Sequence, residues 1–103
     1  MNIIQTDGSG VLFINIFTVK PENQEALIAC MREGVSPDMP GLVSANLLKS
    51  RDGTKVINQM IWESQEAFAQ ATAGNPSIAT TRQRVHELMD AAAPDAFDVV
   101  NLK

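Results

Sequence analysis

A carboxamide and an indole share one face of a predicted strand. Asn58 and Trp62, the chain's only tryptophan, lie four residues apart within residues 54–62. Because strand side chains alternate between faces, Asn58, Met60 and Trp62 should all point to the same side. Such a face either closes a core around a hydrogen-bonded amide, or forms a pocket that holds a flat organic molecule by stacking and one amide.

Composition excludes several classes of partner. The chain has 103 residues, enough for one domain, and its net charge of -4 argues against nucleic acid or an anionic membrane as a partner. Cys30 is the only cysteine, so no internal disulfide and no cysteine-based zinc cage can form. We expect no bound metal, and a protein of the reducing cytoplasm.

We do not expect the N-terminal residues to act as a targeting signal. Residues 1–10 have neither the basic nor the apolar region of a signal peptide, and no apolar run is long enough to cross a membrane. We therefore expect residues 1–10 to be a loose lead-in to a single domain over residues 11–103.

The hydrophobic pattern predicts alternating strands and helices. Residues 11–19 are nearly all apolar, which predicts a central strand buried on both faces. The dipeptide Asp52-Gly53 predicts a two-residue hairpin turn with both residues at positive φ. Ser64 should cap a short helix that ends before Gly74. The other predicted elements are a helix over 21–34, strands over 42–50 and 54–62, a helix over 77–92 and a last strand over 96–103.

This order of elements is βαββαβ, the ferredoxin-like α+β plan of an antiparallel sheet with its helices on one face. The Asp-Gly turn would set Leu47 opposite Asn58, Ala45 opposite Met60 and Val43 opposite Trp62.

The face of the sheet away from the helices carries Leu48, Ile57 and Ile61 among polar residues. It is too apolar to stay in open water, and packing against the sheet of a second copy would cover it. The pattern therefore predicts a homodimer joined through this face.

Three segments carry a resemblance to a known family: FINIFTVKPE, PGLVSANLLKSRDGT and VINQMIWESQEAF. The most specific piece is N-x-x-x-W-E-S-x-E-A-[FY], and P-G-[FL]-x-S-A adds to it. With them the chain resembles the antibiotic biosynthesis monooxygenase family of dimeric α+β barrel proteins. That family includes cofactor-independent oxygenases of aromatic polyketides, quinol monooxygenases and haem-degrading relatives.

The resemblance implies oxidation of a phenolic, quinol or anthrone-like ring by O₂, with no metal or flavin. Asn58 and Trp62 match the strand Asn and Trp of the family pocket, Asn15 matches an Asn on the first strand, and Arg82 matches an Arg six residues after a proline. The amides would orient the substrate oxygens, Trp62 would stack on the ring and Arg82 would offset negative charge. The family's pocket tyrosine falls on Phe68, in a chain that has no tyrosine.

The residues themselves support part of this assignment. Arg82 lies four after Ile78 and three before Val85, on the apolar side of its helix, so we expect it to need an anionic partner or to extend its head to water. His86, one turn further on, or solvent would accept the proton in place of the missing phenol. Met60 would be adaptable pocket lining.

Two other functions stay open. In haem-degrading relatives an axial histidine follows the same Trp by about ten residues, which here is Thr72, and the chain's only histidine lies far beyond it. The other is a non-enzymatic dimeric module that binds a small ligand or serves in stress, for which the fold alone would be enough. A face around Asn58 and Trp62 filled by packed side chains would favour that module.

Overall fold

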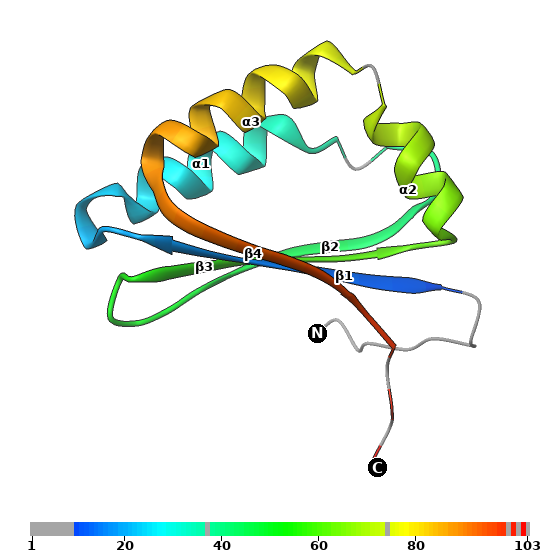
Figure 1. Ribbon diagram of the computed structural model, residues 1–103, viewed down its shortest axis with the longest axis horizontal. Coiled ribbons are helices and arrows are strands. Elements are labelled where there is room, and N and C mark those ends of the chain that lie inside the picture. The colour runs from blue at the N-terminus through cyan, green and yellow to red at the C-terminus, as the bar shows by residue number, and fades with distance from the viewer. Residues whose placement is uncertain (1–9, 37, 74, 99, 101, 103) are drawn as a thin grey trace.

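An antiparallel sheet forms one layer of the molecule, and all the helices pack on one face of it (Figure 1). The computed structural model describes residues 10–36, 38–73, 75–98, 100 and 102. The strand order is β2-β3-β1-β4. The strands are β1 (Val11–Val19), β2 (Leu42–Lys49), β3 (Lys55–Trp62) and β4 (Met89–Phe97); the helices are α1 (Gln24–Gly34), α2 (Gln65–Thr72) and α3 (Pro76–Leu88), with a 3-10 turn, η1 (Pro21–Asn23), before α1. The ferredoxin-like prediction, with the first strand inside the sheet, is confirmed.

Polar side-chain contacts fix where α1 and α2 begin. The Gln24 side chain, at the start of α1, is buried, and its Nε2 donates to the carbonyls of Ser50 and Lys55, each at 3.0 Å. This ties α1 to the β2–β3 hairpin. As predicted, Ser64 caps α2, its Oγ accepting from the backbone N–H of Ala67 at 3.0 Å.

The core lies between α1, α3 and the sheet. Leu27 of α1 and Val56 of β3 are completely buried at its centre. The two helices pack closely at Gly34, where an added Cβ would lie 2.5 Å from the side chain of Thr81. None of the described helices is long and apolar enough to cross a membrane.

The hairpin register agrees with the prediction except at one end. Leu47 pairs with Asn58 and Ala45 with Met60, as expected. The prediction for Val43 was wrong: Leu42 pairs with Trp62, and Val43 is an extra residue in a β-bulge. The bulge leaves Val43 61% exposed.

The turn itself also differs from the prediction. Only Gly53 has a positive φ, of 82°. The carboxylate of Asp52 instead organises the turn, accepting from Ser50 Oγ at 2.8 Å, Thr54 N at 3.0 Å and Thr54 Oγ1 at 2.7 Å. The hydrogen bonds from Thr54 and Ser50 lower the pKa of Asp52 to about 2.

The last strand was placed wrongly. The predicted helix over 77–92 ends at Leu88, and β4 begins at once and pairs with β1 along the edge of the sheet. Pro94 lies inside this strand, which is possible because an edge strand needs fewer ladder donors. Of the predicted strand over 96–103, residues 99, 101 and 103 lie outside the described residues, as do residues 1–9 of the expected lead-in.

The sheet face away from the helices remains partly apolar. Leu48, Ile57 and Ile16 form one row across β2, β3 and β1, and Leu48 is 46% and Ile16 37% exposed. Ile61 is only 6% exposed in the single chain, so it would add less to a dimer interface than expected. The homodimer stays a prediction.

Candidate functional site

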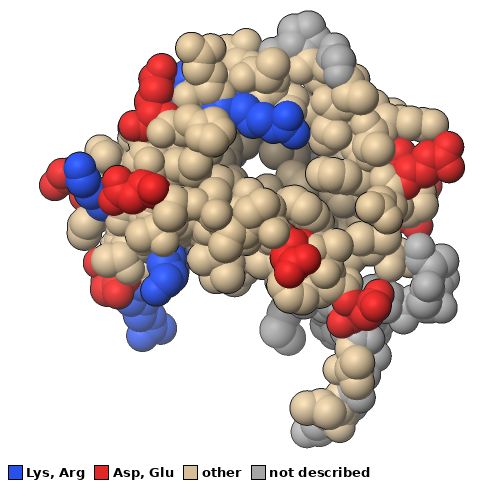
Figure 2. All heavy atoms as spheres, in the orientation of Figure 1, with Lys and Arg blue, Asp and Glu red and all other residues tan. Residues whose placement is uncertain are grey.

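A cavity of about 440 Å³ lies between the helices and the sheet, and we call it the inner cavity. Pockets for small organic molecules typically span about 300–1,000 Å³. Figure 2 shows one face of the molecule hollowed between these layers, with a basic side chain at the rim of the hollow. Every residue predicted for the site lines the inner cavity: Asn15, Asn58, Met60, Trp62, Phe68, Arg82 and His86.

Two carboxamides lie side by side in the sheet wall of the inner cavity. Asn15 of β1 pairs directly with Asn58 of β3. The Oδ1 of Asn15 is buried without a hydrogen-bond partner. Asn58 is half-buried, and no described residue hydrogen-bonds to its amide. A buried acceptor with no partner is unfavourable in a folded protein, so this wall is suited to a polar ligand.

Three aromatic rings form another wall. The Phe68 ring stacks on Phe13, with centroids 5.0 Å apart, and meets Trp62 edge-on at 5.5 Å. Trp62 is only 1% exposed, and its Nε1 is buried without an acceptor among the described residues. Because an indole N–H only donates, this apolar wall also offers one hydrogen bond.

A tight backbone contact holds α2 over the tryptophan. Gly41, just before β2, has a φ of 83°, and a Cβ added there would lie 2.6 Å from the Cβ of Ala67. Its carbonyl accepts from the N–H of Glu63 at 2.8 Å, directly after Trp62. The turn and the first residues of α2 are thus packed together, which fixes Phe68 against Trp62.

Arg82 and His86 occupy a different environment from the two amides. Both are exposed on α3 while lining the inner cavity. Of the two expectations for Arg82, its exposure agrees with a head group that extends to water, and no salt bridge of Arg82 occurs among the described residues. Met60, by contrast, is buried as adaptable lining.

Several lining residues were not predicted. Phe13 precedes Asn15 by two residues on β1, so strand alternation was a signal that it faces the same cavity. Pro94, which pairs with Asn15 from β4, was missed because the last strand was misplaced.

The sequence profile of a family described as antibiotic biosynthesis monooxygenase matches residues 11–84. The chain belongs to this family. The match runs from β1 through α2 to residue 84 within α3, and so includes every predicted residue of the inner cavity except His86.

Two proteins of Streptomyces species are similar to this chain. The chain is 40% identical over 58 residues to the tetracenomycin-F1 monooxygenase of Streptomyces glaucescens, a match that spans 53% of this chain and 52%, about half, of that protein. The structure resembles SnoaB of Streptomyces nogalater, described as a cofactor-independent oxygenase, with a TM-score of 0.74 and 26% identity over 91% of this chain and 96% of that one.

A second solved structure holds a ligand. The monooxygenase ActVA-Orf6 of Streptomyces coelicolor, in complex with nanaomycin D, has a TM-score of 0.79 and is 26% identical, covering 92% of this chain and 91% of that chain.

In this member of the antibiotic biosynthesis monooxygenase family, Phe68 and Thr72 differ from the residues that the resemblance implies at their positions. Phe68 presents a ring without a hydroxyl to the inner cavity. Thr72, at the haem-ligand position of other relatives, lines the cavity too, but its hydroxyl donates to the carbonyl of Phe68 at 2.9 Å within α2. Among the described residues, no group of three His, Cys, Asp or Glu is placed to hold a metal ion.

Proposed function

We propose that the protein is a cofactor-independent monooxygenase that oxidises a phenolic, quinol or anthrone-like aromatic ring with O₂. One observation carries this proposal: the inner cavity is walled by aromatic rings and holds two buried polar atoms without partners, Asn15 Oδ1 and Trp62 Nε1. A flat molecule with oxygen substituents would satisfy both atoms and stack on the rings. The named activities of the similar Streptomyces proteins support the same class of reaction.

The chemistry needs a stabilised substrate anion. Triplet O₂ reacts slowly with closed-shell molecules, whereas a deprotonated ring can transfer one electron to it. The resulting radical and superoxide combine to a peroxide, and loss of water leaves a carbonyl. For an anthrone the sum is one ring CH₂ and one O₂ converted to one C=O and one H₂O, which needs no external reductant.

The chain's own residues would lower the energy of that anion. The Asn58 amide, free of described partners, would donate to the oxyanion that forms on the ring, and Trp62 Nε1 is a second donor in the aromatic wall. The Asn15 oxygen would accept from a substrate hydroxyl and so fix the orientation of the ring.

Proton transfer would take place at the exposed side of the cavity. With Phe68 unable to exchange a proton, His86 and solvent are the acceptors that the mouth of the cavity offers. Arg82, beside them on α3, would offset the negative charge of the substrate.

Assembly is part of the same proposal. A homodimer joined through Leu48, Ile57 and Ile16 would cover the apolar row on the outer sheet face and leave the helix-covered face with its cavity unobstructed.

Oxygen consumption tests the activity directly. Purified protein is incubated with a panel of quinols and anthrones, with metal chelated and flavin absent, and O₂ uptake is compared with the formation of quinone. We expect one quinone per O₂ consumed for at least one ring class. No protein-dependent uptake with any member of the panel would leave the cavity as a ligand-binding site only.

A further inference from the structure

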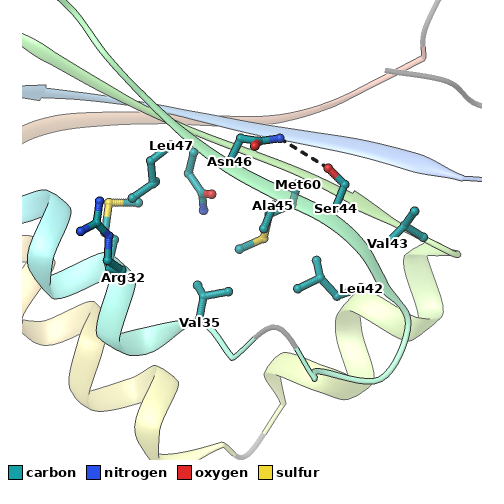
Figure 3. A pocket seen from close by; sticks show the side chains of 11 residues that line it. Arg32, Val35, Leu42, Val43, Ser44, Ala45, Asn46, Leu47 and Met60 are labelled. Carbon is teal, nitrogen blue, oxygen red and sulfur yellow. Dashed lines mark hydrogen bonds between the residues drawn. The ribbon is translucent and has the colours of Figure 1, made fainter. Parts of the chain in front are cut away.

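A second cavity of about 450 Å³ lies at the β2 edge of the sheet, and we call it the edge cavity. It is bounded by the end of α1 and by the edge strand β2. Figure 3 shows Val35, directly after α1, and Met60 of the sheet facing each other across it, with Leu42 and Val43 at one end and Arg32 beside Leu47 at the other.

The two cavities share a wall. Met31, Val35, Asn58 and Met60 line both of them. The inner cavity reaches β4 at one edge of the sheet, and the edge cavity reaches β2 at the opposite edge. Since methionine side chains are unbranched and adaptable, Met31 and Met60 form a partition that a bound molecule can displace. Asn58 then lies where a ligand would pass from one cavity to the other.

Arg32 is the only charged residue among the described residues that line the edge cavity. No salt bridge of Arg32 occurs within the described part of the chain. Arg32 is the smallest of the causes that lower the pKa of Glu25, and the main cause is the hydrogen bond from Lys49 at 2.8 Å. Arg84, by comparison, is paired with Glu33 at 3.7 Å. The guanidinium of Arg32 is therefore available to an external anion.

We propose that the edge cavity is a second subsite that binds a carboxylate substituent of the aromatic substrate, with Arg32 as its partner. This rests on the proposed function, because the ring would lie in the inner cavity and the substituent would cross the methionine partition. A guanidinium suits a carboxylate through paired parallel hydrogen bonds.

The sole tryptophan provides a binding assay that needs no turnover. Quenching of Trp62 fluorescence is measured with anthraquinone-2-carboxylate and with anthraquinone-2-carboxamide, which differ in charge but hardly in shape. Because exposed ion pairs are weak, we expect the carboxylate to bind up to about fivefold more tightly at low salt, and the preference to shrink as salt is added. Arg32→Gln should abolish the preference and Arg32→Lys should keep part of it.

A matched variant controls for net charge. Arg51→Gln removes the same charge from the exposed hairpin, outside both cavities, and should keep the preference. Equal binding of the two probes by the wild type, or a preference that survives Arg32→Gln, would overturn the subsite while leaving the aromatic site intact. Failure of both probes to quench Trp62 would overturn the aromatic site and the subsite together.

Discussion

Replacing Asn58 by Ala should separate a catalytic amide from a structural one. In the structure no described residue hydrogen-bonds to this side chain, which is half-buried against the inner cavity. The substitution of Asn58 therefore breaks no hydrogen bond to a described residue. We expect the free energy of unfolding to change by less than about 1 kcal/mol, the range of substitutions that leave no buried group unpaired.

The expected effect on the reaction is much larger. Loss of one donor to a developing oxyanion lowers the rate by about 100-fold or more. Since each tenfold change is about 1.4 kcal/mol, this is about 2.7 kcal/mol of transition-state stabilisation, well above the expected change in stability. The two quantities therefore distinguish the roles of the amide.

The assay compares kcat/KM for O₂ uptake with the midpoint of urea unfolding. Gln59→Ala is the matched control, because Gln59 is the next residue on β3, is also half-buried, carries the same functional group and lines neither cavity. It should keep the wild-type rate. Full activity of Asn58→Ala on the quinol or anthrone that the wild type oxidises would refute the role of this amide.

Three further predictions use other parts of the molecule. Phe68→Tyr should fold normally and keep or raise kcat, because its hydroxyl would enter the cavity where the family has one; a cooperative melt with kcat lowered tenfold would contradict this. Ile57→Asp should convert the proposed homodimer to monomers or misfolded chain, since it places a charge in the proposed interface, and a dimer mass by light scattering that is the same in wild type and variant would remove that interface. The pKa of Asp52 is lowered from 3.8 to about 2 on folding, so its stabilising contribution is present above pH 3.8 and is lost as the pH falls through about 2. Asp52→Asn should therefore be less stable than wild type at pH 7, and this deficit should shrink at pH 2; an equal deficit at both pH values would show that ionisation is not the cause.

The fold could be predicted from the sequence wherever one local signal dominated. The apolar run of β1, the Ser64 cap and the Asp-Gly turn are strong local signals, and they placed β1, the β2–β3 hairpin and α2. The end of the chain had two competing signals. Met89 and Ala92 continue the apolar stripe of α3, and Pro94 resembles a break, whereas pairing with β1 makes these residues a strand. Such a tertiary contact outweighs local periodicity and is not visible in it.

Which residues form the site could be predicted more fully than how deeply each of them is buried. Alternation along β3 was enough to place Asn58 and Trp62 on one face, and the resemblance added Asn15 and Arg82. Burial was not predictable in the same way. Arg82 follows the helical apolar stripe but is exposed, because the inner cavity leaves that side of α3 without a packed neighbour. A non-enzymatic module with packed side chains around Asn58 and Trp62 would have no such cavity.

The difference in exposure along the inner cavity bears on the missing tyrosine. Asn15 Oδ1 and Trp62 Nε1 are buried and unpartnered at the sheet side, whereas Arg82 and His86 are exposed on α3. A dry wall strengthens the hydrogen bonds that hold an anion, and an exposed mouth allows water or His86 to take up the proton. Under the proposed mechanism these two tasks fall to opposite sides of one cavity. A fixed phenol between them is then dispensable, which is why Phe68 is compatible with oxygenation and why its ring can serve to hold Trp62 and Phe13 in place.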